Sequence, residues 1–407
     1  MSGSQDTSRE FLAAMATALS RYGQTADVIE DDLHACAATL GVEVAFFSVP
    51  TAVFVSYGHG GDMHTRLLHT RDSAIDLQAM GQLDVTLRAV TEGRISAAQG
   101  LAEVRLITAS PLRFPWYMRV LAAGLAAAAI SVFLGGGVRE ITAAAPVGLA
   151  VGAMAVVARR LERLTSLLEL LAGFLAAVLT LALGHVLLPF HLATVVLAGL
   201  ILLLPGLGIT LAVSELAARH LVSGTARLAG AVVTLVSLGF GVAMGYAIFV
   251  KLDLVPPAGP GHAAPHLWLT ALAVAGSTAA LMVTTNSRPR DVWVVLAAVT
   301  GAVFGARFGA WLLGPTVGVA VASLMIGLGS NVYARLTNRP AAVPLVPGLA
   351  VLVPGALGFR GISVFLRSAT GSVQIFAAVL VISAGLVVGL LVADATLPPR
   401  GGREPAD

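Results

Sequence analysis

The sequence predicts a polytopic α-helical membrane protein with about ten transmembrane helices, preceded by a small N-terminal α+β domain. Two observations predict this class. Of the 407 residues, 57% are hydrophobic and only 12% are charged, whereas soluble domains carry about 25% charged residues. The deficit is confined to residues 119–395, where apolar runs of about 20 residues are long enough to cross the hydrocarbon core of a bilayer. Such a chain cannot form a water-soluble surface over its full length.

Residues 1–118 have the composition of a soluble domain, and their pattern predicts four helices and three strands. The helices are expected at 8–22, 25–40, 75–92 and 96–109, and the strands at 43–49, 51–57 and near 65–70. Apolar residues recur at helical spacing, and Gly23 and Gly41 stand where helices stop. The strands are short β-branched and aromatic runs. No apolar core follows a basic start, so we expect no signal peptide and a cytoplasmic domain, and the single Cys36 fits a reducing compartment.

The apolar runs form two groups of five, which define a first membrane half at 119–254 and a second at 267–395. The expected spans are 120–137, 141–158, 167–189, 192–217 and 227–250, then 267–285, 291–313, 315–333, 343–359 and 373–394. A Pro/Gly-rich linker at 255–266 separates the halves, and residues 396–407 form a tail.

The placement of arginines predicts the orientation. With a cytoplasmic N-terminus, the cytoplasmic loops and tail hold Arg159, Arg160, Arg163, Arg219, Arg227, Arg288, Arg290, Arg335, Arg339, Arg400 and Arg403. The opposite side holds Arg139, Lys251, Arg360 and Arg367. Because cytoplasmic loops carry an excess of basic residues, we expect both termini to lie in the cytoplasm, with the chain crossing the cell inner membrane several times.

Five spans in each half would place the second half upside down relative to the first, as a 5+5 inverted repeat. The segment VREITAAAPVGLAVG (138–152) resembles PRDVWVVLAAVTGAVFG (289–305), and LLLPGLGITLAV (202–213) resembles PLVPGLAVLVPG (344–355). The expected fourth and ninth spans therefore each carry a Pro–Gly pair inside an apolar helix.

Five segments carry a resemblance to a known family. They are RYGQTADVIEDDLHACAATLGVEV (21–44), PTAVFVS (50–56), GRISAAQGLAEVRLI (93–107), LLLPGLGITLAVSELAARHLVSGTARLAGA (202–231) and VPLVPGLAVLVPG (343–355). Together they resemble the threonine/serine exporter family. The resemblance extends from about residue 11 to 393 in the order of its parts. It implies a fused two-half exporter of threonine and serine. Related split pairs are associated with succinate, and Glu215 stands where the family pattern leads us to expect Asp.

The Pro–Gly pairs are the candidate substrate site. A break in an apolar helix frees backbone N–H and C=O groups that lipid cannot satisfy, so such breaks line enclosed or watery cavities. Freed N–H groups favour a carboxylate and freed carbonyls favour an ammonium group or an ion. The candidates are Pro205, Gly206, Gly208, Thr210, Pro347, Gly348, Pro354 and Gly355. The alternative is that each pair is only a packing kink.

Glu169 and Glu215 are the candidate proton-coupling residues, because a carboxylate in a low dielectric can exchange protons near neutral pH. Alternatively, Glu169 pairs with an interfacial arginine, and Glu215 holds the loop near Arg219, four residues on. Arg307 is a candidate for binding a substrate carboxylate, and its alternative is to reach the outer interface. The glycines at 301, 305 and 309 permit close helix approach, and the many small residues would permit a homo-oligomer.

The function predicted from these features is secondary export of small hydrophilic metabolites, with an amino acid as substrate and protons as coupling ion. The alternatives are dicarboxylate export and a membrane-embedded sensor that signals through its N-terminal domain. The sequence contains no phosphate loop, nucleophile elbow or zinc-binding spacing, so we expect neither an enzyme nor a cofactor or metal site. The net charge of +3 gives no indication of nucleic-acid binding.

Overall fold

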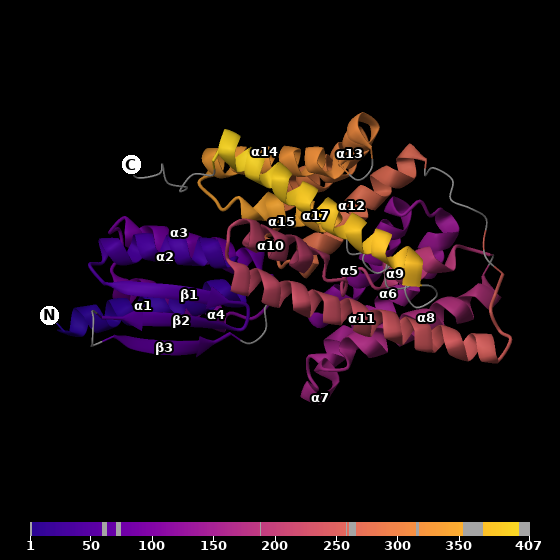
Figure 1. The fold of residues 1–407 in the computed structure, drawn as a ribbon, viewed down its shortest axis with the longest axis horizontal. Coiled ribbons are helices and arrows are strands. Elements are labelled where there is room, and N and C mark those ends of the chain that lie inside the picture. The colour runs from indigo at the N-terminus through magenta and orange to yellow at the C-terminus, as the bar shows by residue number, and fades with distance from the viewer. Residues whose placement is uncertain are drawn as a thin grey trace.

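The computed structural model describes residues 2–58, 63–70, 75–187, 189–257, 259, 266–314, 317–352 and 369–398. The molecule is elongated, with an N-terminal region of helices and strands at one end and a bundle of helices at the other (Figure 1). We call residues 2–109 the N-terminal region and the helices from residue 116 onward the helical bundle. Pro354 and Gly355, together with Arg360, Arg367, Arg400 and Arg403, lie outside the described residues.

The N-terminal region contains the four helices and three strands that the sequence predicts. The elements are α1 (Ser2–Arg21), α2 (Ala26–Thr39), β1 (Val44–Val49), β2 (Ala52–Tyr57), β3 (His64–His69), α3 (Leu77–Thr91) and α4 (Ala97–Ala109). The strands form an antiparallel sheet in the order β1-β2-β3, with Phe47 opposite Phe54 and Phe54 opposite Leu67. Gly23 and Gly41 follow two residues after the ends of α1 and α2, and both have positive φ.

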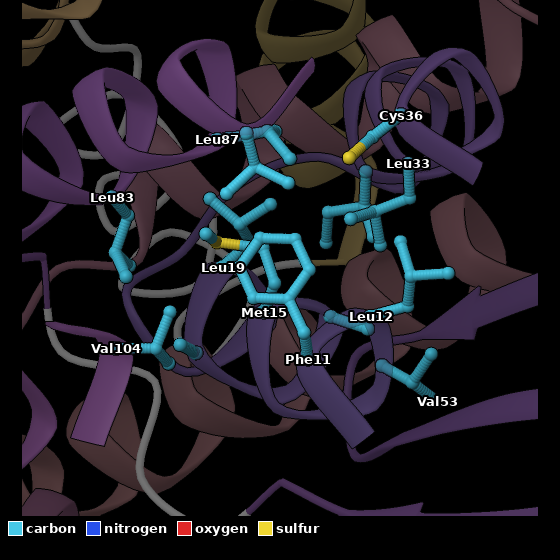
Figure 2. Packing of buried hydrophobic residues seen from close by; sticks show 14 of the residues in the cluster. Phe11, Leu12, Met15, Leu19, Leu33, Cys36, Val53, Leu83, Leu87 and Val104 are labelled. Atoms are coloured by element: carbon cyan, nitrogen blue, oxygen red, sulfur yellow. The ribbon is translucent and has the colours of Figure 1, made fainter. Parts of the chain in front are cut away.

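One hydrophobic core holds the N-terminal region together. Figure 2 shows side chains from α1, α2, α3, α4 and β2 converging on it. Phe11, Leu12 and Met15 of α1 are fully buried at its centre. Cys36 of α2 is also buried in this core as a free thiol. The apolar faces of the amphipathic helices in this region are therefore buried by packing around α1.

The helical bundle follows in chain order. Its elements are α5 (Trp116–Phe133), α6 (Val138–Ala158), α7 (Glu162–Thr165), α8 (Leu168–Val186), α9 (Leu192–Gly199), α10 (Gly206–Ala217), α11 (Leu221–Lys251), α12 (Leu267–Thr284), the 3-10 turn η2 (Pro289–Asp291), α13 (Val292–Leu313), α14 (Gly318–Thr337), α15 (Ala342–Leu352) and α17 (Ala369–Thr396). The longest, α11, runs from beside the N-terminal region to the far end of the bundle (Figure 1).

Seven helices of the described chain are long and apolar enough to cross a membrane: α5, α6, α8, α11, α12, α13 with its preceding turn, and α14. Three shorter apolar segments, Gly206–Ala217, Ala342–Leu352 and Val381–Thr396, overlap the other expected spans. The molecule is therefore a multi-pass membrane protein, while the ten spans and the 5+5 repeat stay predictions.

The two Pro–Gly pairs have different local structures. The expected span 192–217 is interrupted, because α9 ends at Gly199 and α10 begins only at Gly206. Pro205 lies at this interruption, where its missing N–H cannot continue a helix. By contrast, α15 runs without interruption through Pro347. The prediction of a helix break at Pro347–Gly348 is therefore wrong for this segment. Pro347 is buried in α15, which packs against α13 and α14, and a proline is tolerated in a membrane helix where neighbouring groups satisfy the backbone groups that it frees.

Glycines bring the helices of the bundle into backbone contact. Gly173 of α8 faces the carbonyl of Leu238 in α11, and Gly241 of α11 faces the carbonyl of Leu170 in α8. Gly309 of α13 and Gly318 of α14 face each other in the same way. Of the glycines at 301, 305 and 309, which we expected to permit close helix approach, Gly305 and Gly309 lie against α14, whereas Gly301 borders open space.

Candidate functional site

The interruption between α9 and α10 exposes the start of a helix inside the bundle. Pro205 is the N-cap residue of α10 and makes no side-chain capping hydrogen bond. By helix geometry the first N–H groups of α10 have no acceptor within the helix. Thr210 is buried and its Oγ1 donates to the carbonyl of Gly206 at 3.2 Å. A Cβ at Gly208 would meet nothing within 4 Å. The start of α10 therefore carries N–H groups without an acceptor in the helix, and a side chain at Gly208 would have room.

The two Pro–Gly elements lie on adjoining helices. α10 packs against α17 and also contacts α15, which carries Pro347 and Gly348. Both residues of that pair are buried, and a Cβ at Gly348 would press on Ile326 of α14. A first-half and a second-half element therefore meet within the bundle, as a shared substrate site requires.

Glu215 lies at the other end of α10 and is fully buried, with 0% exposure. Arg227 of α11 holds it with two hydrogen bonds, Nε to Oε2 at 3.1 Å and Nη2 to Oε1 at 3.0 Å. The Ser223 hydroxyl donates to Oε2 at 2.9 Å. The backbone N–H of Ala26, the first residue of α2, donates to Oε1 at 3.3 Å. Four donors thus hold this carboxylate, one of them from the N-terminal region.

The alternative role considered for Glu215 was to hold the loop near Arg219. The structure pairs Glu215 with Arg227 instead. Arg219 is exposed and adopts a positive φ of 67° in the turn after α10. Arg227, two turns into α11, faces the carboxylate instead.

Neither Glu169 nor Arg307 has a described contact with the Pro–Gly elements. Glu169 is half-buried in the first turn of α8, and none of the described ion pairs includes it. Arg307 is exposed, donates to the Thr270 hydroxyl at 3.3 Å and lies 5.8 Å from the centre of the Phe304 ring. It lies beside the first turn of α12.

A second junction ties the N-terminal region to the loop after α12. Asn286 adopts a positive φ of 51°, and its Nδ2 donates to Oδ2 of Asp76 at 2.5 Å. The N–H of Leu77 donates to the carbonyl of Thr285 at 2.9 Å. Asp76 also caps α3 by accepting from the N–H of Ala79. Burial raises the pKa of Asp76, and the hydrogen bonds from Ala79 and Asn286 oppose that shift.

The N-terminal region thus contacts both halves of the bundle. It reaches the first half through Glu215 and through Glu30, whose Oε2 lies 3.9 Å from Nδ1 of His220. It reaches the second half through Asn286 and through Ala342 and Val346 of α15, which pack against its core. Sequence reasoning missed this arrangement; the one signal was Asp76, a helix-capping residue ahead of an apolar run.

Comparison with known proteins agrees with this architecture. A family model of threonine/serine exporters matches residues 10–249, which include the N-terminal region and the first half. A second model, described as "Threonine/Serine exporter, ThrE", matches residues 267–396. The chain belongs to the threonine/serine exporter family. Both halves are fused in one polypeptide, as the sequence resemblance implied.

Relatives of this exporter-family chain include fungal membrane proteins. The pheromone-regulated membrane protein 10 of Eremothecium gossypii is 24% identical over 86% of this chain and 48% of its own length. Its namesake in Saccharomyces cerevisiae is 24% identical over 85% of this chain and 46% of its own length. An uncharacterised protein of Schizosaccharomyces pombe is 25% identical over 86% of this chain and 44% of its own length. The chain spans about half or less of the length of these relatives, and no solved structure matches it.

Proposed function

We propose that this chain is a secondary transporter that exports threonine and serine by alternating access of one site between α10 and α15. The observation that carries the proposal is the interruption at Pro205–Gly206, whose helix adjoins the Pro347–Gly348 helix of the other half. An amino acid has a carboxylate and an ammonium group. The N–H groups at the start of α10, which have no acceptor within the helix, suit the carboxylate, and the carbonyls freed between α9 and α10 suit the ammonium group.

Protons are the proposed coupling ion, with Glu215 and Glu169 as candidates. Proton exchange at Glu215 requires its contact with Arg227 to open, because the two side chains share two hydrogen bonds. Since Ala26 binds the same carboxylate, exchange there would be linked to movement of the N-terminal region. Glu169 could exchange without such a movement. Arg307, near the C-terminal end of α13, is proposed to meet the substrate on its exit rather than at the central site.

The proposed location is the cell inner membrane with both termini in the cytoplasm, on the arginine asymmetry of the loops. A cysteine placed in the Arg335–Arg339 loop should resist an impermeant thiol reagent in intact cells, while a cysteine replacing Pro257, an exposed residue of the 255–266 linker, should react. The opposite labelling pattern would overturn this orientation.

The substrate is tested with purified protein in proteoliposomes. Labelled threonine and serine should accumulate when a pH gradient is imposed, and should equilibrate slowly without one. Accumulation of succinate alone would assign the chain to dicarboxylate export.

A membrane-embedded sensor is the second candidate, and one observation favours it. The N-terminal region contacts both halves of the bundle, so a ligand-driven shift between the halves would change its docking. A sensor predicts that threonine alters hydrogen exchange in α2 and α3 while no substrate crosses the membrane. Transport across the bilayer would exclude a role as sensor alone.

A further inference from the structure

An arginine followed by an acid opens the second helix of each half of the bundle. Arg139 and Glu140 lie in the first turn of α6, and Arg290 and Asp291 directly precede α13. Both acids are almost fully buried, with exposures of 9% for Glu140 and 5% for Asp291. These pairs fall at matching positions of the internal similarity between 138–152 and 289–305. Burial of an acid is costly unless it is paired, so the contacts of both acids are informative.

In the first half, the pair binds the segment that leads into α9. Oε1 of Glu140 accepts from the N–H of His191 at 3.0 Å, and His191 is the residue before α9. The Arg139 guanidinium donates to the carbonyl of Pro189 at 3.3 Å. The other oxygen, Oε2, accepts from the N–H of Gly137 at 2.7 Å. Glu140 therefore joins the start of α6 to the start of the interrupted helix.

In the second half, the acid binds the segment that leads into α15. Oδ1 of Asp291 accepts from Nη1 of Arg339 at 2.7 Å, and this ion pair is largely buried. The same Nη1 lies 3.4 Å from the Tyr333 hydroxyl of α14. Arg339 shortly precedes α15, which starts at Ala342. Asp291 therefore joins the start of α13 to the start of the helix that carries Pro347.

The two contacts lie at opposite ends of the bundle. α12 ends at the N-terminal region, where Asn286 binds Asp76, and Asp291 follows five positions later. α5 starts just after the N-terminal region and crosses the bundle before α6 begins, so Glu140 lies at the far end. Phe190 there binds Gly259, beyond the end of α11. The packing of the attached helices also corresponds: α6 packs against α9 as α13 packs against α15.

We propose that Glu140 and Asp291 are paired positioning residues, each of which holds closed the face of the transport path at which it lies. The proposal rests on the alternating-access function above. The Asp291 contact fixes α15 on the side of the N-terminal region, and the Glu140 contact fixes α9 on the opposite side. Opening of one face requires its own contact to break while the other contact persists.

Cysteine labelling from each side of the membrane tests this proposal without any transported substrate. The reporter is Gly208→Cys in a Cys36→Ser background, since Gly208 borders open space and lies within the first turn of α10. Asp291→Ala should raise the labelling rate by an impermeant maleimide from the side of the N-terminal region only. Glu140→Ala should raise it from the opposite side only. We expect the labelling rate to rise about tenfold, which corresponds to a loss of about 1.4 kcal/mol in the stability of the closed state.

Matched variants separate positioning from general loosening. Asp394 accepts a hydrogen bond from Asn331 at 2.7 Å, and none of the described hydrogen bonds or ion pairs joins it to α9 or α15, so Asp394→Ala should leave both labelling rates unchanged. Arg339→Gln should reproduce Asp291→Ala, and Glu140→Asp should restore much of the closed state. If an alanine variant does not fold, Asp291→Asn and Glu140→Gln should give smaller changes in the same directions.

Equal changes from both sides, or none, would overturn the proposal and leave the acids as helix caps. Transport is measured on the native chain, because the reporter replaces a residue of the proposed site. One-sided labelling changes together with no transport of threonine or serine by the native chain would support the positioning role while contradicting the proposed substrate. Transport of threonine by the native chain, together with labelling changes from both sides, would support the proposed substrate and contradict the positioning role.

Discussion

The N-terminal region and the helical bundle are stabilised by different kinds of contact. In the N-terminal region, large side chains such as Phe11, Leu12 and Met15 are fully buried in one cluster. In the bundle, backbones meet directly at glycines, as at Gly309 and Gly318.

The difference follows from the two solvents. Water drives large apolar side chains together, whereas lipid is as apolar as leucine and provides no such force between helices. Close backbone packing and buried polar contacts must then fix the helices. The junction between the two regions combines both kinds of contact, with apolar packing at Val346 and buried polar groups at Glu215 and Asn286.

The largest effect is expected in the core of the N-terminal region. Phe11→Ala should lower the free energy of unfolding by about 3–5 kcal/mol, because the substitution removes buried apolar atoms from the core and leaves a cavity. Leu106→Ala is the matched control, since Leu106 is 70% exposed, and it should change stability little. Thermal unfolding of the purified protein measures both. Equal losses would show that burial in this core does not determine stability.

The next effect is expected at the junction. Glu215→Ala should cost about 3–5 kcal/mol locally, because it leaves Arg227 buried without its partner. Hydrogen exchange should rise in the segment that starts at Ala26, whose N–H loses its acceptor. The double variant with Arg227→Ala should recover part of the loss. Glu10→Ala, which breaks the exposed pair with Arg105, should have an effect of at most about 1 kcal/mol. Unchanged exchange at Ala26 would contradict the docking role of Glu215.

A smaller effect is expected inside the bundle. Gly309→Ala adds a methyl group against the backbone of Gly318 and should cost about 1–3 kcal/mol through overpacking. Gly301→Ala meets open space and should be neutral or slightly stabilising, because alanine favours helix. Detergent-solubilised protein heated and analysed by size exclusion gives the comparison. If both variants melt alike, glycine contact does not set the α13–α14 packing.

The smallest effect concerns pH. Burial, with a further contribution from Asp84, raises the pKa of Asp32 in the N-terminal region to about 6. An acid whose pKa is raised in the folded state stabilises the fold when protonated, and this contribution is lost as the pH rises from about 4 through about 6. Asp32→Asn should therefore be more stable than the native chain at pH 7.5 by about 1 kcal/mol, and equal to it near pH 4. Asp31→Asn, at an exposed position, is the control. An advantage that persists at pH 4 would exclude this titration.

Local features of the fold could be predicted from the sequence. The helix ends at Gly23 and Gly41 depend on the conformational freedom of glycine within one turn, and the strand pair depends on short β-branched runs. The interruption before Gly206 follows from the missing N–H of Pro205. Each of these depends on neighbours in the chain.

The partners of the candidate residues could not be predicted. Glu215 is bound by Arg227, twelve positions away, and by Ala26, 189 positions away. Asn286 binds Asp76 across 210 positions. Such contacts depend on how helices pack, which helical periodicity does not specify. Pro347 shows the converse, because neighbouring helices accommodate a proline that the local rule expects to break α15.

Counterflow across proteoliposomes tests the central claim most directly, because it requires only that one site alternates between the two faces. Native protein preloaded with unlabelled threonine should concentrate labelled threonine transiently. Gly206→Leu and Gly348→Leu should abolish counterflow while the protein still inserts, because each places a bulky side chain at a buried position of the proposed site. Gly230→Leu, at an exposed position of α11 with open space around it, should retain counterflow. Full counterflow by both Gly206→Leu and Gly348→Leu would contradict a substrate site between α10 and α15.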